Sequence, residues 1–137
     1  RTSDQYFVAV RHRNHFVAMT ANAIALSPAP VTIDFTAPTT STYGTNATKA
    51  VNPVQVLWAG NTVRDGALKY TGSGNDRDAI LVVVGGNTPN NTYIGYAVTD
   101  VNMDGTIKYT GAGNDRDPIL VNVGSTTPNN TRTEQVP

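Results

Sequence analysis

The chain has 137 residues, 39% of them hydrophobic and 15% charged, which is enough for one modest core or two very small ones. Ten Lys and Arg residues balance ten Asp and Glu residues, so the zero net charge gives no attraction for nucleic acid or an anionic membrane surface. Cysteine is absent, which excludes disulfides and thiolate metal sites but assigns no cellular compartment. No apolar run approaches the roughly 20 residues of a membrane-spanning helix.

We interpret the chain as a processed piece of a longer, exported polypeptide. It begins at Arg1 without Met and enters a strand pattern almost at once. A basic segment followed by an apolar one, the usual export leader, does not stand at its start. We therefore expect any export signal to have been lost upstream.

Short apolar segments dominate residues 1–36. They are rich in β-branched and aromatic side chains, and turn-formers such as Asn14 and the stretch 27–30 separate them. The segments are 5–13, 16–19, 23–26 and 31–35. This pattern predicts an α+β protein whose N-terminal part is a small β-sheet of three or four strands, the end of a larger, partial sandwich.

A change of composition separates this part from the rest. The segment 37–46 is rich in Ser, Thr, Pro and Gly and has little to bury, so we predict a linker over 37–53. The remaining residues, 54–137, form the second predicted domain. It opens with an apolar segment whose Trp58 we expect in a core between two repeated copies.

An internal repeat defines this second domain. The stretch 65–92 returns, almost letter for letter, 39 residues later as 104–131. Each copy contains a loop, a short extended piece, a Gly-rich turn and an apolar segment that follows Asn-Asp-Arg-Asp. An Asp cap, a Pro at the first helical position of the second copy and a Gly just past the end predict helices near 78–84 and 117–123. Three consecutive valines would also allow a strand in the first copy.

The segment before the second copy has the spacing of a calcium loop. From Asp100, oxygen-bearing side chains occur at every second residue, and Gly105 directly follows the third of them. That spacing is typical of the first half of an EF-hand-type loop, in which the seventh residue adds its backbone carbonyl. The twelfth position, where a bidentate carboxylate is expected, is Gly111, so we predict an enlarged loop closed by a later Asp. The predicted ligands are Asp100, Asn102, Asp104, Thr106, Asp115 and Asp117.

The equivalent loop of the first copy is poorer in ligands. A shift of 39 residues gives a second, weaker site at Asn61, Asp65, Ala67, Asp76 and Asp78. Val63 replaces Asn102 and cannot bind a metal, so this site is either weak or empty. In both copies the alternative is that these Asp and Asn residues form Asx-turns and helix caps without any metal.

The duplicated loop-and-helix organisation resembles a dockerin, the paired calcium-loop module that docks secreted bacterial proteins onto cohesin partners. The resemblance covers about residues 58–131, and the segment 100–107 carries it most clearly. A second resemblance, over nearly the whole chain, is to the C-terminal region of large haemagglutinin-like surface proteins of Gram-negative bacteria. It rests on the strand 6–15 and the element 108–120. These resemblances imply an exported protein at the bacterial cell surface, with calcium as the bound ion.

No catalytic arrangement is evident in the sequence. His12 and His15 flank a predicted turn without a nearby carboxylate to orient them, and we interpret them as surface side chains. No serine lies in a Gly-x-Ser-x-Gly setting, and no Lys-Ser or Lys-Thr pair follows the Gly-rich turns. We therefore expect a protein that is not an enzyme.

Two functions remain. The first is a calcium-stabilised structural or protein-docking module, whose partner is another cell-surface protein or the rest of its parent polypeptide. The second is a carbohydrate-binding adhesin domain in which Trp58, Tyr70 and Tyr109 stack on sugar rings. Arg77 and Arg116 could belong to such a recognition face, but bridges to their neighbouring aspartates are the favoured interpretation.

Overall fold

The structure, a computed structural model, describes residues 4–137. Over this range the fold is α+β, with ten short strands paired in two-stranded antiparallel sheets and two short helices. The described residues divide into two compact units. The first unit contains 4–12, 16–58 and 135–137, and the second contains 13–15 and 59–134. Among the described residues, no helix is long and apolar enough to cross a membrane.

The first unit consists of three strand pairs. They are β1 (Asp4–Tyr6) with β4 (Ile24–Leu26), β2 (Ala9–Val10) with β3 (Ala18–Met19), and β5 (Thr48–Val51) with β6 (Val54–Leu57). Its small core contains Phe16, Val17, Ala18 and Ala47, all less than 5% exposed. Most other side chains of these strands are exposed or half-buried, because two-stranded ribbons have little surface to cover.

The predicted strands of the first unit are partly confirmed. The segment 5–13 contains two strands, β1 and β2, instead of one. The segment 31–35 is not a strand in the structure. There Asp34 accepts hydrogen bonds from the backbone N–H and hydroxyl of Thr36 at 2.8 and 2.6 Å, and its own carbonyl accepts the N–H of Ala37. This local turn competes with strand pairing, which is why alternation alone gave a wrong prediction.

The structure divides the chain at a different place from the predicted linker. Residues 37–53 include β5, which pairs with β6 over four residues, and they belong to the first unit. Trp58 also belongs to the first unit, where its indole N–H donates to the carbonyl of Asn46 at 2.9 Å. The expectation that Trp58 lies in the core between the copies is therefore wrong. A single large apolar residue does not reveal which neighbour it will cover.

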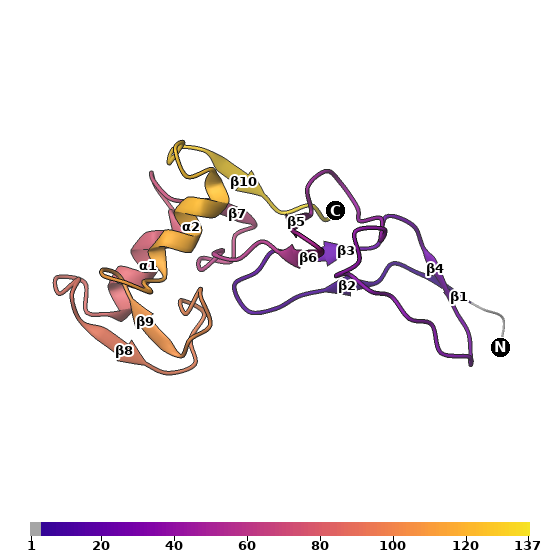
Figure 1. Ribbon diagram of the computed structural model, residues 1–137, viewed down its shortest axis with the longest axis horizontal. Coiled ribbons are helices and arrows are strands. Elements are labelled where there is room, and N and C mark those ends of the chain that lie inside the picture. Colours follow the sequence, from indigo (N-terminus) through magenta and orange to yellow (C-terminus); the bar gives the residue numbers. More distant parts are fainter. Residues whose placement is uncertain (1–3) are drawn as a thin grey trace. The chain divides into compact units, whose positions relative to one another are not determined.

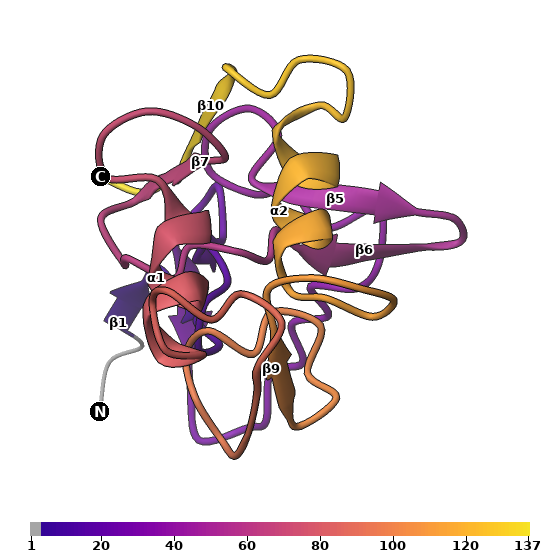
Figure 2. The same cartoon turned by 90° about the vertical axis from the view of Figure 1, so that its left-hand side faces the viewer.

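The second unit consists of the two copies and their helices. Helix α1 (Asp76–Val83) and helix α2 (Arg116–Val123) lie side by side, with one strand pair at each end of the helix pair (Figure 1; Figure 2). The strands are β7 (Ala67–Lys69), β8 (Thr92–Ile94), β9 (Thr106–Lys108) and β10 (Thr131–Thr133).

The copies are joined by a reciprocal exchange of strands. Strand β7 of the first copy pairs with β10 of the second, and β9 of the second copy pairs with β8 of the first. The registers are equivalent, because Lys69 faces Thr131 just as Lys108 faces Thr92. Each copy thus supplies the strand that the other lacks, and the duplicated unit closes on itself with approximate two-fold symmetry.

The core of the second unit follows the same symmetry. Apart from Val101, its buried apolar side chains come in pairs that are 39 residues apart, and each is at most 4% exposed. The pairs are Leu68 and Ile107, Ile80 and Ile119, and Val84 and Val123. Full burial of each such side chain contributes roughly 1.5–3 kcal/mol. The core of the second unit is therefore formed jointly by both copies, whose helices contact each other.

The two predicted helices are confirmed, with starts one or two residues earlier than expected. The oxygens of Asn75 and Asn114 accept the N–H groups of Asp78 and Asp117 at 3.0 and 2.9 Å, so Asn takes the capping role predicted for Asp. Pro118 consequently lies in the first turn of α2, where its missing N–H has no helical partner to lose.

A close approach at Gly60 gives a test of this packing. Gly60 has φ +117°, and a Cβ there would lie 2.9 Å from side-chain carbons of both Leu68 and Ile119. We expect Gly60→Ala to lower the free energy of unfolding by about 2–4 kcal/mol, from backbone strain plus overpacking. Gly72, at φ +84° with nothing within 4 Å, is the matched control, and Gly72→Ala should cost only about 1 kcal/mol. Equal losses in urea denaturation would contradict this account.

Candidate functional site

The second loop, residues 100–106, is shaped by its own oxygen-bearing side chains. Asp100 Oδ2 accepts the N–H of Gly105 at 3.2 Å, Asn102 Oδ1 that of Asp104 at 3.0 Å, and Asp104 Oδ1 that of Thr106 at 2.8 Å. Met103 and Gly105 take left-handed conformations at φ 63° and 82°. The alternating pattern therefore folds into a tight loop, and these turns belong both to a calcium loop and to its metal-free alternative.

One carboxylate oxygen of this loop has no partner. Asp100 is 2% exposed, and its Oδ1 is buried without a hydrogen bond. A buried acceptor left unsatisfied costs about 1–3 kcal/mol, and more when it is charged. A cation at Oδ1 would remove this cost, so the donor set of the second loop fits calcium at its first position.

Asp115, predicted as the distal ligand, has a different set of partners. Its carboxylate accepts the N–H groups of Val101, Asn102 and Lys108 at 2.6, 3.2 and 2.8 Å, and the residue is fully buried. Both oxygens are thus engaged by backbone. The side chain ties the loop, strand β9 and the start of helix α2 together, which leaves it little capacity to bind an ion directly.

Asp76 makes the equivalent contacts in the first copy. It is fully buried and accepts the N–H groups of Val63 and Lys69 at 3.1 and 2.8 Å. The hydroxyl of Thr62 lies 3.4 Å from the same carboxylate and donates to the Asp76 carbonyl at 2.6 Å. The sequence contained a signal for this role: both copies keep this Asp, although Asn102 in one loop is replaced by Val63 in the other.

Asp117 and Asp78 lie at the surface, about 60% exposed at their side chains. Asp117 accepts a hydrogen bond from the amide of Asn114 at 2.8 Å and lies 3.5 Å from the guanidinium of Arg116. Arg116 also stacks over Tyr109, 5.2 Å from the ring centroid. The first copy repeats all three contacts. The predicted bridge between each arginine and its neighbouring aspartate is therefore confirmed, and Asp117 belongs to the helix cap.

The positively charged side chain of Arg13 contacts the second loop, which the sequence did not predict. Arg13 donates to Asp100 Oδ2 and to the Asp100 carbonyl at 3.1 Å each, and to the Ala97 carbonyl at 3.0 Å. Its guanidinium lies 4.0 Å from the ring centroid of Tyr96. Burial is the largest single effect and works against its charge, but the hydrogen bonds and charge attraction to Asp100 and Tyr96 together outweigh it and raise the pKa of Arg13. A separation of 87 residues concealed this pair from any reading of local sequence.

The first loop, residues 61–67, has the same backbone turns with fewer ligands. Arg64 and Gly66 are left-handed at φ 63° and 76°, and Asp65 accepts the N–H of Ala67 at 2.9 Å. Asn61 is 4% exposed, and its Oδ1 is buried without a partner, as is Asp100 Oδ1 in the second loop. Val63 has no side-chain oxygen to offer as a ligand, and it is 43% exposed.

The predicted metal ligands thus fall into two groups. The loop residues Asp100, Asn102, Asp104 and Thr106 lie together, whereas Asp115 is buried against backbone amides and Asp117 lies in the first turn of helix α2, bonded to the capping Asn114. Over residues 4–137, no three His, Cys, Asp or Glu side chains are arranged to hold a metal ion. A calcium ion here would need amide, hydroxyl and carbonyl oxygens beside its carboxylates.

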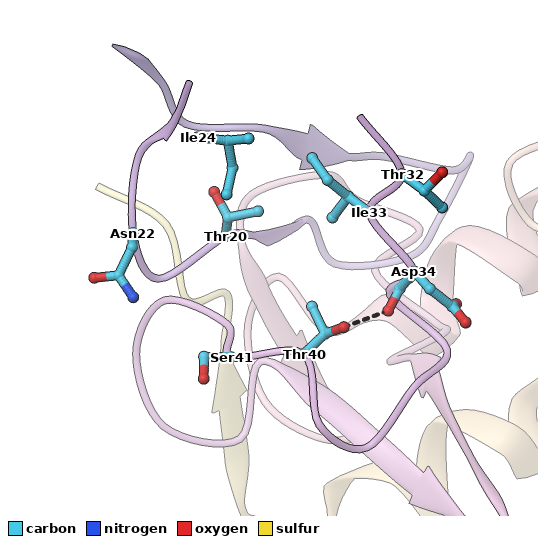
Figure 3. Close-up of a pocket in the computed structure, with 8 residues that line it drawn as sticks. All are labelled: Thr20, Asn22, Ile24, Thr32, Ile33, Asp34, Thr40 and Ser41. Carbon is cyan, nitrogen blue, oxygen red and sulfur yellow. Dashed lines mark hydrogen bonds between the residues drawn. The ribbon is translucent and has the colours of Figure 1, made fainter. Parts of the chain in front are cut away.

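The first unit offers two open, polar pockets. One, of about 260 Å³, lies beside β4 and is shown in Figure 3, where the hydroxyl of Thr40 donates to the carbonyl of Asp34. It is lined by Thr20, Asn22, Ile24, Thr32, Ile33, Asp34, Thr40 and Ser41. The other, of about 350 Å³, contains Trp58 among hydroxyl and amide side chains such as Thr48, Asn46 and Gln55. Neither contains a residue predicted to bind metal.

Comparison of the chain with models of protein families, with curated proteins and with solved structures finds no significant match.

Asp115→Asn tests whether this carboxylate organises the copy. An amide would turn its NH₂ group toward backbone N–H donors, so we expect a loss of about 3 kcal/mol in the free energy of unfolding. Asp117→Asn, at an exposed position of the same helix, is the control and should change stability by less than about 1 kcal/mol. Chemical denaturation measures both. A mild effect at residue 115 would show that the buried carboxylate is dispensable.

The buried aspartates also give a pH prediction. Burial, which outweighs the backbone hydrogen bonds, raises the pKa of Asp76 and Asp115. The folded protein then holds these protons more tightly than the unfolded chain. Their contribution to stability is present at low pH and is lost as the pH rises from the unfolded to the raised folded pKa. Carboxyl NMR titration should place both pKa values above those of the exposed aspartates, and equal values would contradict the assignment.

Proposed function

We propose that the chain is a non-enzymatic, calcium-stabilised structural or docking module of a larger protein exported to the bacterial cell surface. Its second unit would act as a dockerin-like tandem, and the likeness to haemagglutinin-like surface proteins supports the location. The observation that carries the proposal is the buried, unpartnered Asp100 Oδ1 in a loop with the oxygen spacing of a calcium site.

The local charges support a divalent ion. Asp100 and Asp104 belong to the second loop, and Asp115 is close enough to Asp100 for their repulsion to raise the pKa of Asp115, although burial contributes more. Three carboxylates against the single guanidinium of Arg13 leave two negative charges. Calcium would neutralise them and hold together a Gly-rich loop that buries little apolar surface.

Exposed apolar side chains beside the second loop support a docking role. Tyr93, Ile94, Tyr96 and Met103 are 50–83% exposed and come from β8, the segment that follows it and the second loop. By the 39-residue shift, the first three correspond to Arg132, Thr133 and Gln135. The fold thus does not require apolar residues at these positions, and another surface protein or the rest of the parent polypeptide would cover them.

Calcium titration by calorimetry on chelator-treated protein tests the proposal. We expect binding with a raised melting temperature, because calcium binds the folded loop and not the unfolded chain. Asp104→Ala should weaken the tighter site by at least about tenfold, or 1.4 kcal/mol. Asp65→Ala, the equivalent change in the first loop, is the control and should leave that site intact. Absence of heat and of a melting shift in the unaltered protein would refute the calcium assignment.

The alternative is a carbohydrate-binding adhesin, and one observation favours it. Trp58 is half-buried in the open pocket of the first unit, beside the hydroxyl and amide groups that neutral sugars bind. A cation over the ring does not separate the three aromatic residues, because Lys49 lies 5.6 Å from the ring centroid of Trp58 just as Arg77 and Arg116 lie over Tyr70 and Tyr109. What favours Trp58 is its place in the pocket.

A glycan array separates the two functions. The structural proposal predicts no specific glycan, whether or not calcium is present. A specific hit that is retained by Tyr109→Leu and lost in Trp58→Leu would instead establish the adhesin function. It would also place sugar binding at the pocket of the first unit.

A further inference from the structure

The second loop supplies too few ligands for a calcium ion on its own. Its side chains and one carbonyl offer four positions, at Asp100, Asn102, Asp104 and Thr106, whereas calcium takes six to eight oxygens. Asp115 adds at most one further position, because its Oδ1 accepts two backbone N–H groups and its Oδ2 accepts one. Further ligands, if an ion is to be held firmly, must come from outside the loop.

Three more buried oxygens lie without hydrogen-bond partners in the same unit. They are Asn14 Oδ1, Asn61 Oδ1 and Thr99 Oγ1, on residues that are 1%, 4% and 2% exposed. Together with Asp100 Oδ1 they make four unsatisfied buried oxygens. Native proteins leave few such atoms, and a group of them usually signals a bound water or ion.

Hydrogen bonds through Asn14 bring these residues to one place. The Asn14 carbonyl accepts the N–H groups of Gly60 and Asn61 at 3.1 and 2.8 Å. Its side-chain amide donates to the carbonyls of Val98 and Asp100 at 2.7 and 3.0 Å, on either side of Thr99. Asn14 thus joins the start of the first loop to the start of the second.

The same bonds fix the orientation of the Asn14 amide. Its nitrogen faces two carbonyl oxygens, so an exchanged amide would place oxygen against oxygen. Asn14 Oδ1 is therefore a true free acceptor. An amide oxygen, a hydroxyl and a carboxylate oxygen are the ligand types that a hard cation takes.

We propose that Asn14 Oδ1, Asn61 Oδ1, Thr99 Oγ1 and Asp100 Oδ1 bind one calcium ion at the seam between the two loop starts. This inference rests on the calcium binding of the proposed function and assigns the ligands that the second loop lacks. Asn61 then serves the same ion as Asp100 instead of a separate, weaker site. The ion ties both copies and the segment 13–15 together.

Thr99→Val and Asn61→Asp test the shared site in opposite directions. Calorimetry should show one ion per unaltered chain. Thr99→Val, which removes one ligand at nearly constant volume, should weaken its binding about tenfold, and Asn61→Asp, which adds a charge, should tighten the binding of the same ion about tenfold. Asp34→Ala, which removes an exposed carboxylate of the first unit that belongs to neither loop, is the control and should bind as the unaltered chain does.

Thermal melts with chelator and with calcium distinguish the loss of a calcium ligand from a folding defect. Thr99→Val removes a hydroxyl that has no partner, so without calcium it should melt at or above the temperature of the unaltered protein, and below it with calcium. If Asp104→Ala abolishes binding while Thr99→Val and Asn61→Asp leave the affinity unchanged, the ion belongs to the loop alone and the shared site is wrong. If the unaltered protein binds no calcium, the proposed function fails first, and the seam holds water.

Discussion

The second unit depends on a carboxylate placed where three backbone segments meet. Asp76 in the first copy and Asp115 in the second are fully buried, and each accepts N–H groups from its loop and its strand while lying at the start of its helix. A short loop, a three-residue strand and a two-turn helix have little intrinsic stability. The buried carboxylate gives them a common partner, and the backbone donors that it satisfies offset part of its desolvation cost.

Duplication supplies what this arrangement cannot supply for one copy alone. Each copy offers only three or four buried apolar side chains, among them Ile80 or Ile119, and strands that have no partner in their own copy. Exchange of the last strands closes both sheets and places the two helices against each other (Figure 2). A mutation in either copy is therefore expected to unfold both, because the core is shared.

The segment around Arg13 and Asn14 breaks the symmetry of the tandem. It contacts the starts of both loops but lies outside the repeat, so the 39-residue shift gives it no counterpart. This asymmetry coincides with the difference between the loops, where Asp100 and Asn102 in one correspond to Asn61 and Val63 in the other. If the two loop starts share one ion, as we propose, Asn61 serves the same ion as Asp100, which accounts for the degenerate ligands of the first loop.

The sequence by itself determined the α+β class, the repeat, the two helices and the bridges at Arg77 and Arg116, because each of these depends on residues close together in the chain. Only the tertiary structure decided the exchange of strands, the burial of Asp115 against backbone amides and the contact of Arg13 with Asp100. The local pattern at Asp115 fits a metal ligand and a buried hydrogen-bond acceptor equally well. What separates the two roles is which backbone N–H groups reach the carboxylate, and these come from residues up to 14 positions away.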